Sequence, residues 1–206
     1  MGVALLVRRL GRDAKGSVLR ARSRRRFRKI SRVANLQLEL GATKRRAEWV
    51  TVDLRGGDIA WNLTNRIPLP ANSVTRIYSS HMFEHFPFKT LTSLLADIHR
   101  ILKPGGTLSV AVPDFERYAR AYVAGHQFRP PDSPAYKGGL ALTGSVIDEL
   151  NYLVYQNGRH NYMFDGQNLQ NILLRAGFSK VSLRDYDPSL DAKGRQYESI
   201  YAIAIK

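Results

Sequence analysis

Two histidines and a glutamate lie within five residues of one another in the run His81-Met82-Phe83-Glu84-His85. The spacing His-x-x-Glu-His is that of an inverted zinc-protease motif, in which two imidazoles bind zinc and the glutamate acts as base. That chemistry needs one helix to carry both imidazoles, whereas an apolar strand ends here at Ser80 and Pro87 follows almost at once. We therefore expect no metal at this segment. His81 and His85 are instead candidate general bases, because imidazole titrates near neutral pH; a capping or packing role explains either residue equally well.

Two further polar residues could act on a substrate. His160 lies in a polar and aromatic loop, and a plain surface loop is its alternative explanation. Asp114 follows an apolar strand, where open α/β folds place their ligands. It could equally cap the next helix, because aspartate is a preferred N-cap residue.

The elements that must position these residues can be predicted from the hydrophobic pattern. Beyond residue 35, apolar strands alternate with helical patterns, which predicts an α/β sheet covered by helices. Leu91, Leu94, Leu95, Ile98 and Ile101 recur at three- and four-residue steps and predict a helix over Phe88–Ile101. Strands are expected over 36–40, 49–54, 59–61, 76–80, 107–112, 181–186 and 199–205, and further helices over 114–123, 144–155 and 165–176. The prolines and glycines of 128–139 indicate an irregular lid or substrate loop.

A helix-turn-strand unit is predicted around the run Leu102-Lys103-Pro104-Gly105-Gly106-Thr107-Leu108. Lys103 is expected in the last helical turn, Pro104 prevents its continuation, and Gly105-Gly106 allow the chain to reverse. This unit, with the corner Val112-Pro113-Asp114 that follows it, resembles the turn between the fourth helix and the fifth strand of class I S-adenosylmethionine-dependent methyltransferases. The resemblance implies a single Rossmann-like, doubly wound and mostly parallel sheet of about seven strands, with a final antiparallel strand and helices on both faces.

The same resemblance, which covers about residues 36–120, implies a set of cofactor residues. Glu39 and Gly41 match the family's acid-x-Gly loop, and Thr43 stands where a second glycine is expected. Asp53 lies only twelve residues after Gly41, so the helix between them can have a turn or two at most. The residues expected to bind S-adenosylmethionine are Glu39, Gly41, Ala42, Thr43, Asp53, Leu54, Asn62, Leu63, Ser80 and His81, with Asp53 on the ribose and Asn62-Leu63 beside the adenine. A plain strand-to-helix turn is the alternative for the glycine loop.

The branch of the family with a His-x-x-Glu-His segment acts on sugars, glycans and secondary metabolites, so the resemblance implies O-methylation of a small-molecule or glycan acceptor. A degenerate scaffold without catalysis is the alternative, because Thr43, Asn62 and the basic run 44–46 depart from the family pattern. A nucleic-acid methyltransferase is less favoured, since the sequence has no Asn/Asp-Pro-Pro-Tyr motif.

Charge is concentrated at the N-terminus. The 206 residues carry a formal net charge of +15, and residues 1–35 hold twelve Lys or Arg against Asp13, a balance of +11 that leaves +4 for the rest. We expect a basic leader over 1–35, amphipathic or disordered, before a methyltransferase-like domain at 36–206 with a loop insertion at about 124–142. Residues 1–34 could contact an anionic membrane surface or, less favoured, nucleic acid, could be a targeting segment, or could be a solvated tail.

The leader does not have the pattern of an export signal. Its apolar run of five residues after Gly2 is far too short to span a bilayer and precedes the charges that a secretory signal would place first. The chain has no cysteine, which suits a reducing compartment. We therefore expect a cytoplasmic protein, or one held peripherally at the inner face of the membrane.

Overall fold

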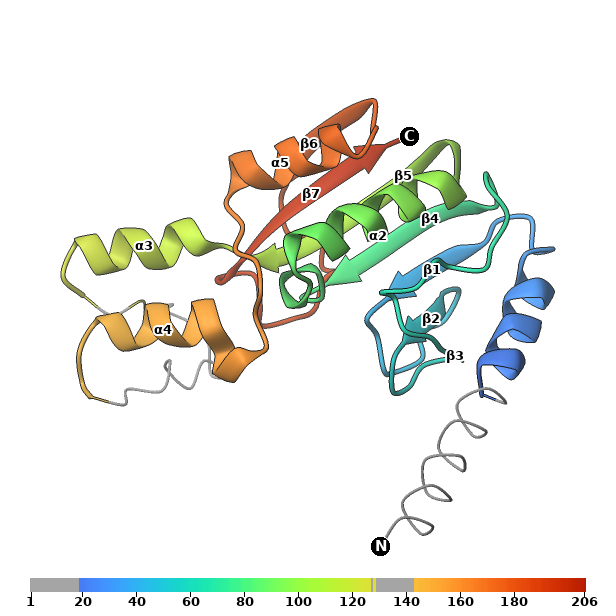
Figure 1. Ribbon diagram of the computed structural model, residues 1–206. Coiled ribbons are helices and arrows are strands. Elements are labelled where there is room, and N and C mark those ends of the chain that lie inside the picture. Colours follow the sequence, from blue (N-terminus) through green and yellow to red (C-terminus); the bar gives the residue numbers. More distant parts are fainter. Residues whose placement is uncertain (1–18, 127, 129–142) are drawn as a thin grey trace, which may run out of the picture.

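The computed structural model describes residues 19–126, 128 and 143–206 (Figure 1). Its seven-stranded sheet has the order β3-β2-β1-β4-β5-β7-β6. The strands are β1 (Gln37–Leu40), β2 (Val50–Asp53), β3 (Ile59–Ala60), β4 (Val74–Ser80), β5 (Leu102–Pro113), β6 (Lys180–Arg184) and β7 (Ser199–Ile205). The helices are α2 (Phe88–Ile101), α3 (Phe115–Val123), α4 (Ile147–Tyr155) and α5 (Gly166–Arg175), with short 3₁₀ helices η1 (Phe83–His85) and η2 (Gln156–Gly158). β7 runs antiparallel to both of its neighbours, and the other described pairings are parallel. The predicted Rossmann-like sheet with a final antiparallel strand is therefore confirmed.

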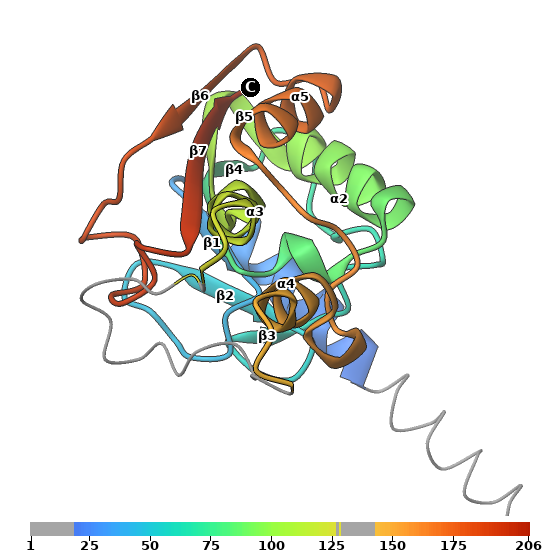
Figure 2. The same ribbon diagram turned by 90° about the vertical axis from the view of Figure 1, so that its left-hand side faces the viewer.

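The apolar positions of α2 determine where the core lies. The five residues that predicted this helix are all buried, and its bounds are those expected from the sequence. They pack on Leu38, Ile77 and Leu108, which alternate with more polar residues along their strands. α2 and α5 cover the same face of the sheet (Figure 2).

The Pro-Gly-Gly segment differs from the prediction. β5 begins at Leu102, directly after α2, and Lys103 therefore lies in the strand and not in a helical turn. Val74 pairs with Leu102 and Arg76 with Thr107, so residues 103–106 bulge out of the ladder. Gly105 adopts φ +75°, and a Cβ on Gly106 would lie 2.8 Å from the Lys103 carbonyl oxygen. The two glycines thus permit a bulge within one strand, where a reversal was expected.

The connection from β1 to β2 is shorter than expected. Residues 41–49 contain no helix, which corrects the prediction of a turn or two. Arg46 and Trp49 instead form an isolated antiparallel bridge. The Trp49 ring packs edge-on to Tyr78 at 6.2 Å, on the face of the sheet opposite Ile77. The Trp49 side chain and the segment 187–195, through Asp191, therefore pack on this part of β4.

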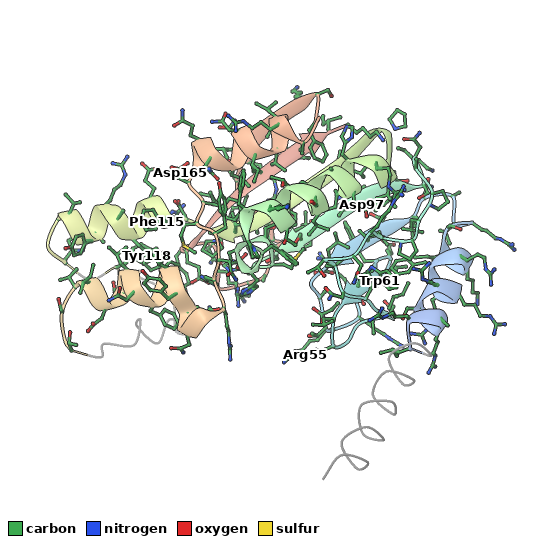
Figure 3. The ribbon with its side chains drawn as sticks, viewed as in Figure 1. Arg55, Trp61, Asp97, Phe115, Tyr118 and Asp165 are labelled. Carbon is green, nitrogen blue, oxygen red and sulfur yellow. The ribbon has the colours of Figure 1, made fainter. Side chains whose placement is uncertain are left out.

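α3 and α4 extend beyond the carboxyl ends of the central strands (Figure 1). Tyr118 of α3 is buried between them (Figure 3). α4 begins three residues later than predicted, because residues 143–145 form a turn closed on Asp148, whose carboxylate accepts hydrogen bonds from the Thr143 and Gly144 N–H groups. Apart from Phe128, the predicted irregular loop over 128–139 lies outside the described residues.

A helix over residues 19–30 is packed against the sheet beside β3. Phe27 is completely buried and meets the edge of Trp61 at 5.6 Å, and Ser23 Oγ donates a hydrogen bond of 2.8 Å to the Ala60 carbonyl (Figure 3). The apolar side of this helix therefore contributes to the core of the domain, although the predicted boundary at residue 35 placed these residues in the leader. Residues 1–18 lie outside the described part of the chain. Within the described part, no helix combines the length and the hydropathy needed to cross a bilayer.

Candidate functional site

A cavity of about 800 Å³ opens where β1 and β4 end at the carboxyl edge of the sheet. The loop after β1, residues 41–46, forms one wall together with Ser80 and His81. Residues 188–192 and Arg195, from the connection between β6 and β7, form the other wall. Its size lies within the range of small-molecule sites, and parallel sheets bind their ligands at this edge.

The glycine loop is built around a close contact. Gly41 has φ +85°, and a Cβ there would lie 2.6 Å from Met82 Cγ, so both conformation and space require glycine. The Gly41 N–H donates to the Val52 carbonyl, while the N–H groups of Ala42 and Thr43 have no hydrogen-bond partner among the described residues. Thr43 does not adopt a positive φ, so its β-branched side chain causes no backbone strain. Two backbone donors are therefore available to an anionic group.

Glu39 and Arg46 bring opposite charges to this cavity. Arg46 Nη1 lies 3.7 Å from Glu39 Oε2, and the same guanidinium donates to the carbonyls of Ser189 and Leu190 at 2.6 and 2.9 Å. Burial raises the pKa of Glu39, and Arg46 opposes that shift. Arg46 thus connects the glycine loop to the opposite wall.

A buried cluster that the sequence analysis did not identify supports that opposite wall. The Asp191 carboxylate, which is 1% exposed, accepts hydrogen bonds from Arg184 at 2.6 and 2.7 Å and from the Tyr78 hydroxyl at 3.0 Å. Burial raises the pKa of Tyr78. No sequence signal marked Asp191, because it lies in an irregular segment more than 100 residues from Tyr78. The cluster holds the segment 187–195 against β4.

The predicted adenosine residues lie at the same sheet edge but do not line this cavity. Asp53 ends β2, and its Oδ1 accepts a hydrogen bond of 2.7 Å from the Arg55 N–H (Figure 3). Leu54 is 58% exposed, and the exposed Asn62 accepts from the Thr64 N–H. Leu63 is buried and borders a separate cavity that Asp97 also lines. The structure thus brings together Glu39, Gly41, Ala42, Thr43, Ser80 and His81, with Asp53 at the end of β2 and Asn62 just after β3.

His81 is in an environment that opposes its predicted role as general base. Its backbone has φ +48°, and its Nε2 shares a hydrogen bond of 2.7 Å with Ser199 Oγ. Burial lowers the pKa of His81 to about 3, so the imidazole is neutral and weakly basic at neutral pH. Its Nδ1 lies 3.6 Å from Glu84 Oε1, and burial raises the pKa of Glu84 to about 8.

The other predicted catalytic residues separate into two groups. One ligand atom from each of Glu84, His85 and His160 lies within 4.8 Å of the others, and the two imidazole rings are 5.1 Å apart. Burial lowers the pKa of His160. Asp114 is instead the N-cap of α3, where it accepts from the Glu116 N–H at 3.1 Å and from Arg117 at 2.9 Å. Both oxygens of its carboxylate therefore accept hydrogen bonds from the first turn of α3.

Comparisons with known proteins identify the fold. The family model of a methyltransferase domain matches residues 22–183. A SAM-dependent methyltransferase from Archaeoglobus fulgidus is similar in structure, with a TM-score of 0.52 and 15% identity over 92% of this chain and 94% of that one. A SAM-dependent methyltransferase from Thermotoga maritima has a TM-score of 0.51 and 16% identity over 97% of both chains. The chain matches no curated protein. At these identities the structural likeness shows the fold alone.

Proposed function

The chain belongs to the methyltransferase domain family, and from this premise we propose that it transfers the methyl group of S-adenosylmethionine to an oxygen of a small-molecule or glycan acceptor. The observation that carries the proposal is the cavity of about 800 Å³ at the carboxyl edge, beside a glycine loop with two N–H groups that have no partner in the described part of the chain. The unstrained Thr43 weakens the main argument for a degenerate scaffold.

The residues present fit the cofactor. The N–H groups of Ala42 and Thr43 would bind the carboxylate of its amino-acid tail, with Glu39 nearby for the ammonium group. Asp53 would accept hydrogen bonds from the ribose hydroxyls, and the Asn62 amide would contact the adenine. When bound, S-adenosylmethionine supplies a methyl group that its sulfonium already activates.

The protein's own work is then to position the acceptor and to receive its proton. The Nδ1 atoms of His85 and His160 lie 3.0 and 2.5 Å from backbone carbonyls, so these nitrogens donate and each Nε2 keeps a free lone pair. An acceptor hydroxyl hydrogen-bonded to one of these nitrogens would give up its proton there as its oxygen attacks.

The first test concerns Asp53. Asp53→Asn keeps the acceptor for the Arg55 N–H but removes the charge that strengthens hydrogen bonds to ribose, so the affinity for S-adenosylmethionine should fall about tenfold or more. Calorimetric titration with S-adenosylmethionine and its demethylated product measures this. Asp185→Asn changes an exposed acid whose carboxylate has no hydrogen bond or ion pair among the described residues, so it is the control and should bind as the natural chain does. Unchanged affinity in a folded Asp53→Asn protein would refute the assignment, and absence of binding in the natural chain would favour the scaffold alternative.

We also propose that the helix over 19–30 contacts an anionic membrane surface through charge alone. Arg22, Arg25, Arg26, Arg28, Lys29 and Arg32 line one exposed groove. The apolar side of the helix is packed on the sheet through Phe27, so it is not available for insertion into lipid. Basic residues near an anionic bilayer each contribute about 1 kcal/mol at low salt, and this attraction is screened as ionic strength rises.

Vesicle sedimentation tests that surface. The natural chain should bind vesicles that contain phosphatidylserine and be released by salt, and the double charge reversal Arg25→Glu/Arg28→Glu should weaken binding by at least about tenfold. Arg175→Glu/Lys180→Glu reverses two exposed cations elsewhere and should have a much smaller effect. If both pairs of substitutions weakened vesicle binding equally, binding would depend on the net charge of the chain and not on this groove. Tighter binding to RNA than to vesicles would assign the groove to nucleic acid.

A further inference from the structure

Glu84, His85 and His160 form a compact cluster of ligand-type side chains. Glu84 and His85 come from η1, and His160 comes from the segment after η2. Backbone hydrogen bonds join the two segments, because the N–H groups of Asn161 and Tyr162 both donate to the Glu84 carbonyl, at 2.8 and 3.2 Å. The Asn161 amide also donates to the His85 carbonyl at 3.0 Å. The three side chains are therefore held in place by the backbone around them.

The hydrogen bonds of the two histidines determine which nitrogens are free. His85 Nδ1 lies 3.0 Å from the Arg159 carbonyl and His160 Nδ1 lies 2.5 Å from the Leu153 carbonyl. A carbonyl can only accept, so each Nδ1 carries the proton and each Nε2 presents a lone pair. Metal-binding histidines have this arrangement, in which the other ring nitrogen donates to a carbonyl or a carboxylate and orients the ring.

Glu84 provides an independent observation. Its side chain is 1% exposed, and its Oε2 is buried with no hydrogen-bond partner among the described residues. A buried carboxyl oxygen without a partner is costly, and a bound ion, which would take the place of the Glu84 proton, is one of the few explanations for it. His81 does not satisfy this atom, because its Nδ1 lies 3.6 Å from the other oxygen, Oε1.

The geometry points to a divalent transition-metal site, of the zinc class, formed by a carboxylate oxygen of Glu84 and by Nε2 of His85 and of His160. Two imidazoles and one carboxylate are a known zinc ligand set that leaves a further position open. Ligands about 2.1 Å from zinc at a tetrahedral angle lie ~3.4 Å apart. A carboxylate oxygen of Glu84 and one nitrogen of each imidazole lie within 4.8 Å of one another, so the side chains must move closer together to hold the ion. His85 is exposed, which gives the ion access from solvent.

This site differs from the one that the motif His-x-x-Glu-His suggests. That motif would use His81 and His85 on a single helix. Here η1 is only three residues long, and His81 is hydrogen-bonded to Ser199. The third ligand comes from a loop about 75 residues later in the chain. The expectation of no metal rested on the absence of a long helix, and the tertiary contact with His160 removes that requirement.

Titration of the chelator-treated full-length chain with Zn²⁺, and with Co²⁺ as a spectroscopic probe, tests the proposal. The natural chain should bind one ion, and the visible Co²⁺ spectrum should indicate imidazole ligands. His85→Gln, His160→Gln and Glu84→Gln should each weaken Zn²⁺ binding at least about tenfold. Glutamine at 160 can still donate to the Leu153 carbonyl, and residue 85 is exposed, so these variants should fold.

His99→Gln is the matched control, because His99 packs on Phe178 outside the cluster. It should bind Zn²⁺ as tightly as the natural chain. The proposal fails if the natural chain binds no Zn²⁺ at micromolar concentration. It also fails if the double variant His85→Gln/His160→Gln keeps the natural affinity, or if His99→Gln loses as much affinity as the cluster variants. These readouts do not involve S-adenosylmethionine, so they test the ion site separately from methyl transfer. An ion bound at both Nε2 atoms would leave neither free to receive the acceptor's proton, so tight Zn²⁺ binding would exclude the base role proposed above for His85 and His160.

Discussion

Asp191→Ala is expected to lower the free energy of unfolding by about 3–5 kcal/mol, because it leaves the Arg184 guanidinium partly buried and unpaired. Arg184 makes two short hydrogen bonds to this carboxylate, and the Tyr78 hydroxyl makes a third. The Asp187 N–H also donates to Asp191, at 2.8 Å, so the variant should loosen the segment 187–195 as well. Since this segment forms one wall of the cavity, we expect weaker binding of S-adenosylmethionine in addition to lower stability.

Chemical denaturation measures the change in stability. The matched control is the exposed ion pair between Arg120 and Glu116 on α3, which has the same chemistry at the surface. Glu116→Ala should change the denaturation midpoint very little, because exposed pairs contribute little to stability. If both substitutions had the same small effect, the buried cluster would not be what holds the segment 187–195.

The second large effect is expected at Phe27. Phe27→Ala should reduce the free energy of unfolding by about 3–5 kcal/mol, because it removes a completely buried ring and leaves a cavity beside Trp61. Leu19→Ala, on the same helix but 50% exposed, should change stability by about 0.5 kcal/mol or less. The comparison measures how far this helix belongs to the folded domain.

Truncations give a second measure of the same point. Removal of residues 1–34 should destabilise the chain at least as much as Phe27→Ala. Removal of residues 1–18 should destabilise it less, because Ser23 and Phe27 stay in place. Thermal melting of both truncated chains distinguishes these cases. A fully stable chain without residues 1–34 would contradict the packing of Phe27 and restore the boundary at residue 35.

Local patterns in the sequence are sufficient for most of the fold. The spacing of Leu91, Leu95 and Ile98 predicts α2 with its observed bounds, because a helix that packs on a sheet repeats its apolar side every 3.6 residues. The caps at Asp114 and Asp165 depend on hydrogen bonds to residues two and three positions later, so they are also readable from the sequence. The bulge at Gly105-Gly106 cannot be predicted from the sequence, because the same glycines permit either a reversal or a bulge. Pairing with β4 decides between the two.

The residue types at the site are likewise evident from the sequence, and their partners are not. Glu39 and Asp53 lie near the ends of predicted strands, and Gly41 and His81 come directly after predicted strands, which places these four residues at one sheet edge by topology alone. Their environments come from segments far away in the chain. His81 shares a hydrogen bond with Ser199, which is 118 residues away in the sequence. Asp191 accepts a hydrogen bond from Tyr78, which is 113 residues away.

The N-terminal helix and the histidine cluster show the physical reason for this division. The sequence by itself determined that residues 20–32 are basic and that His85 and His160 are ligand-type side chains. Burial of Phe27 against Trp61, and the approach of His160 to Glu84, were decided only by the tertiary structure. Hydrophobic periodicity is a property of neighbouring residues, whereas burial, pKa and ligand geometry depend on groups that the folded chain brings together from distant positions.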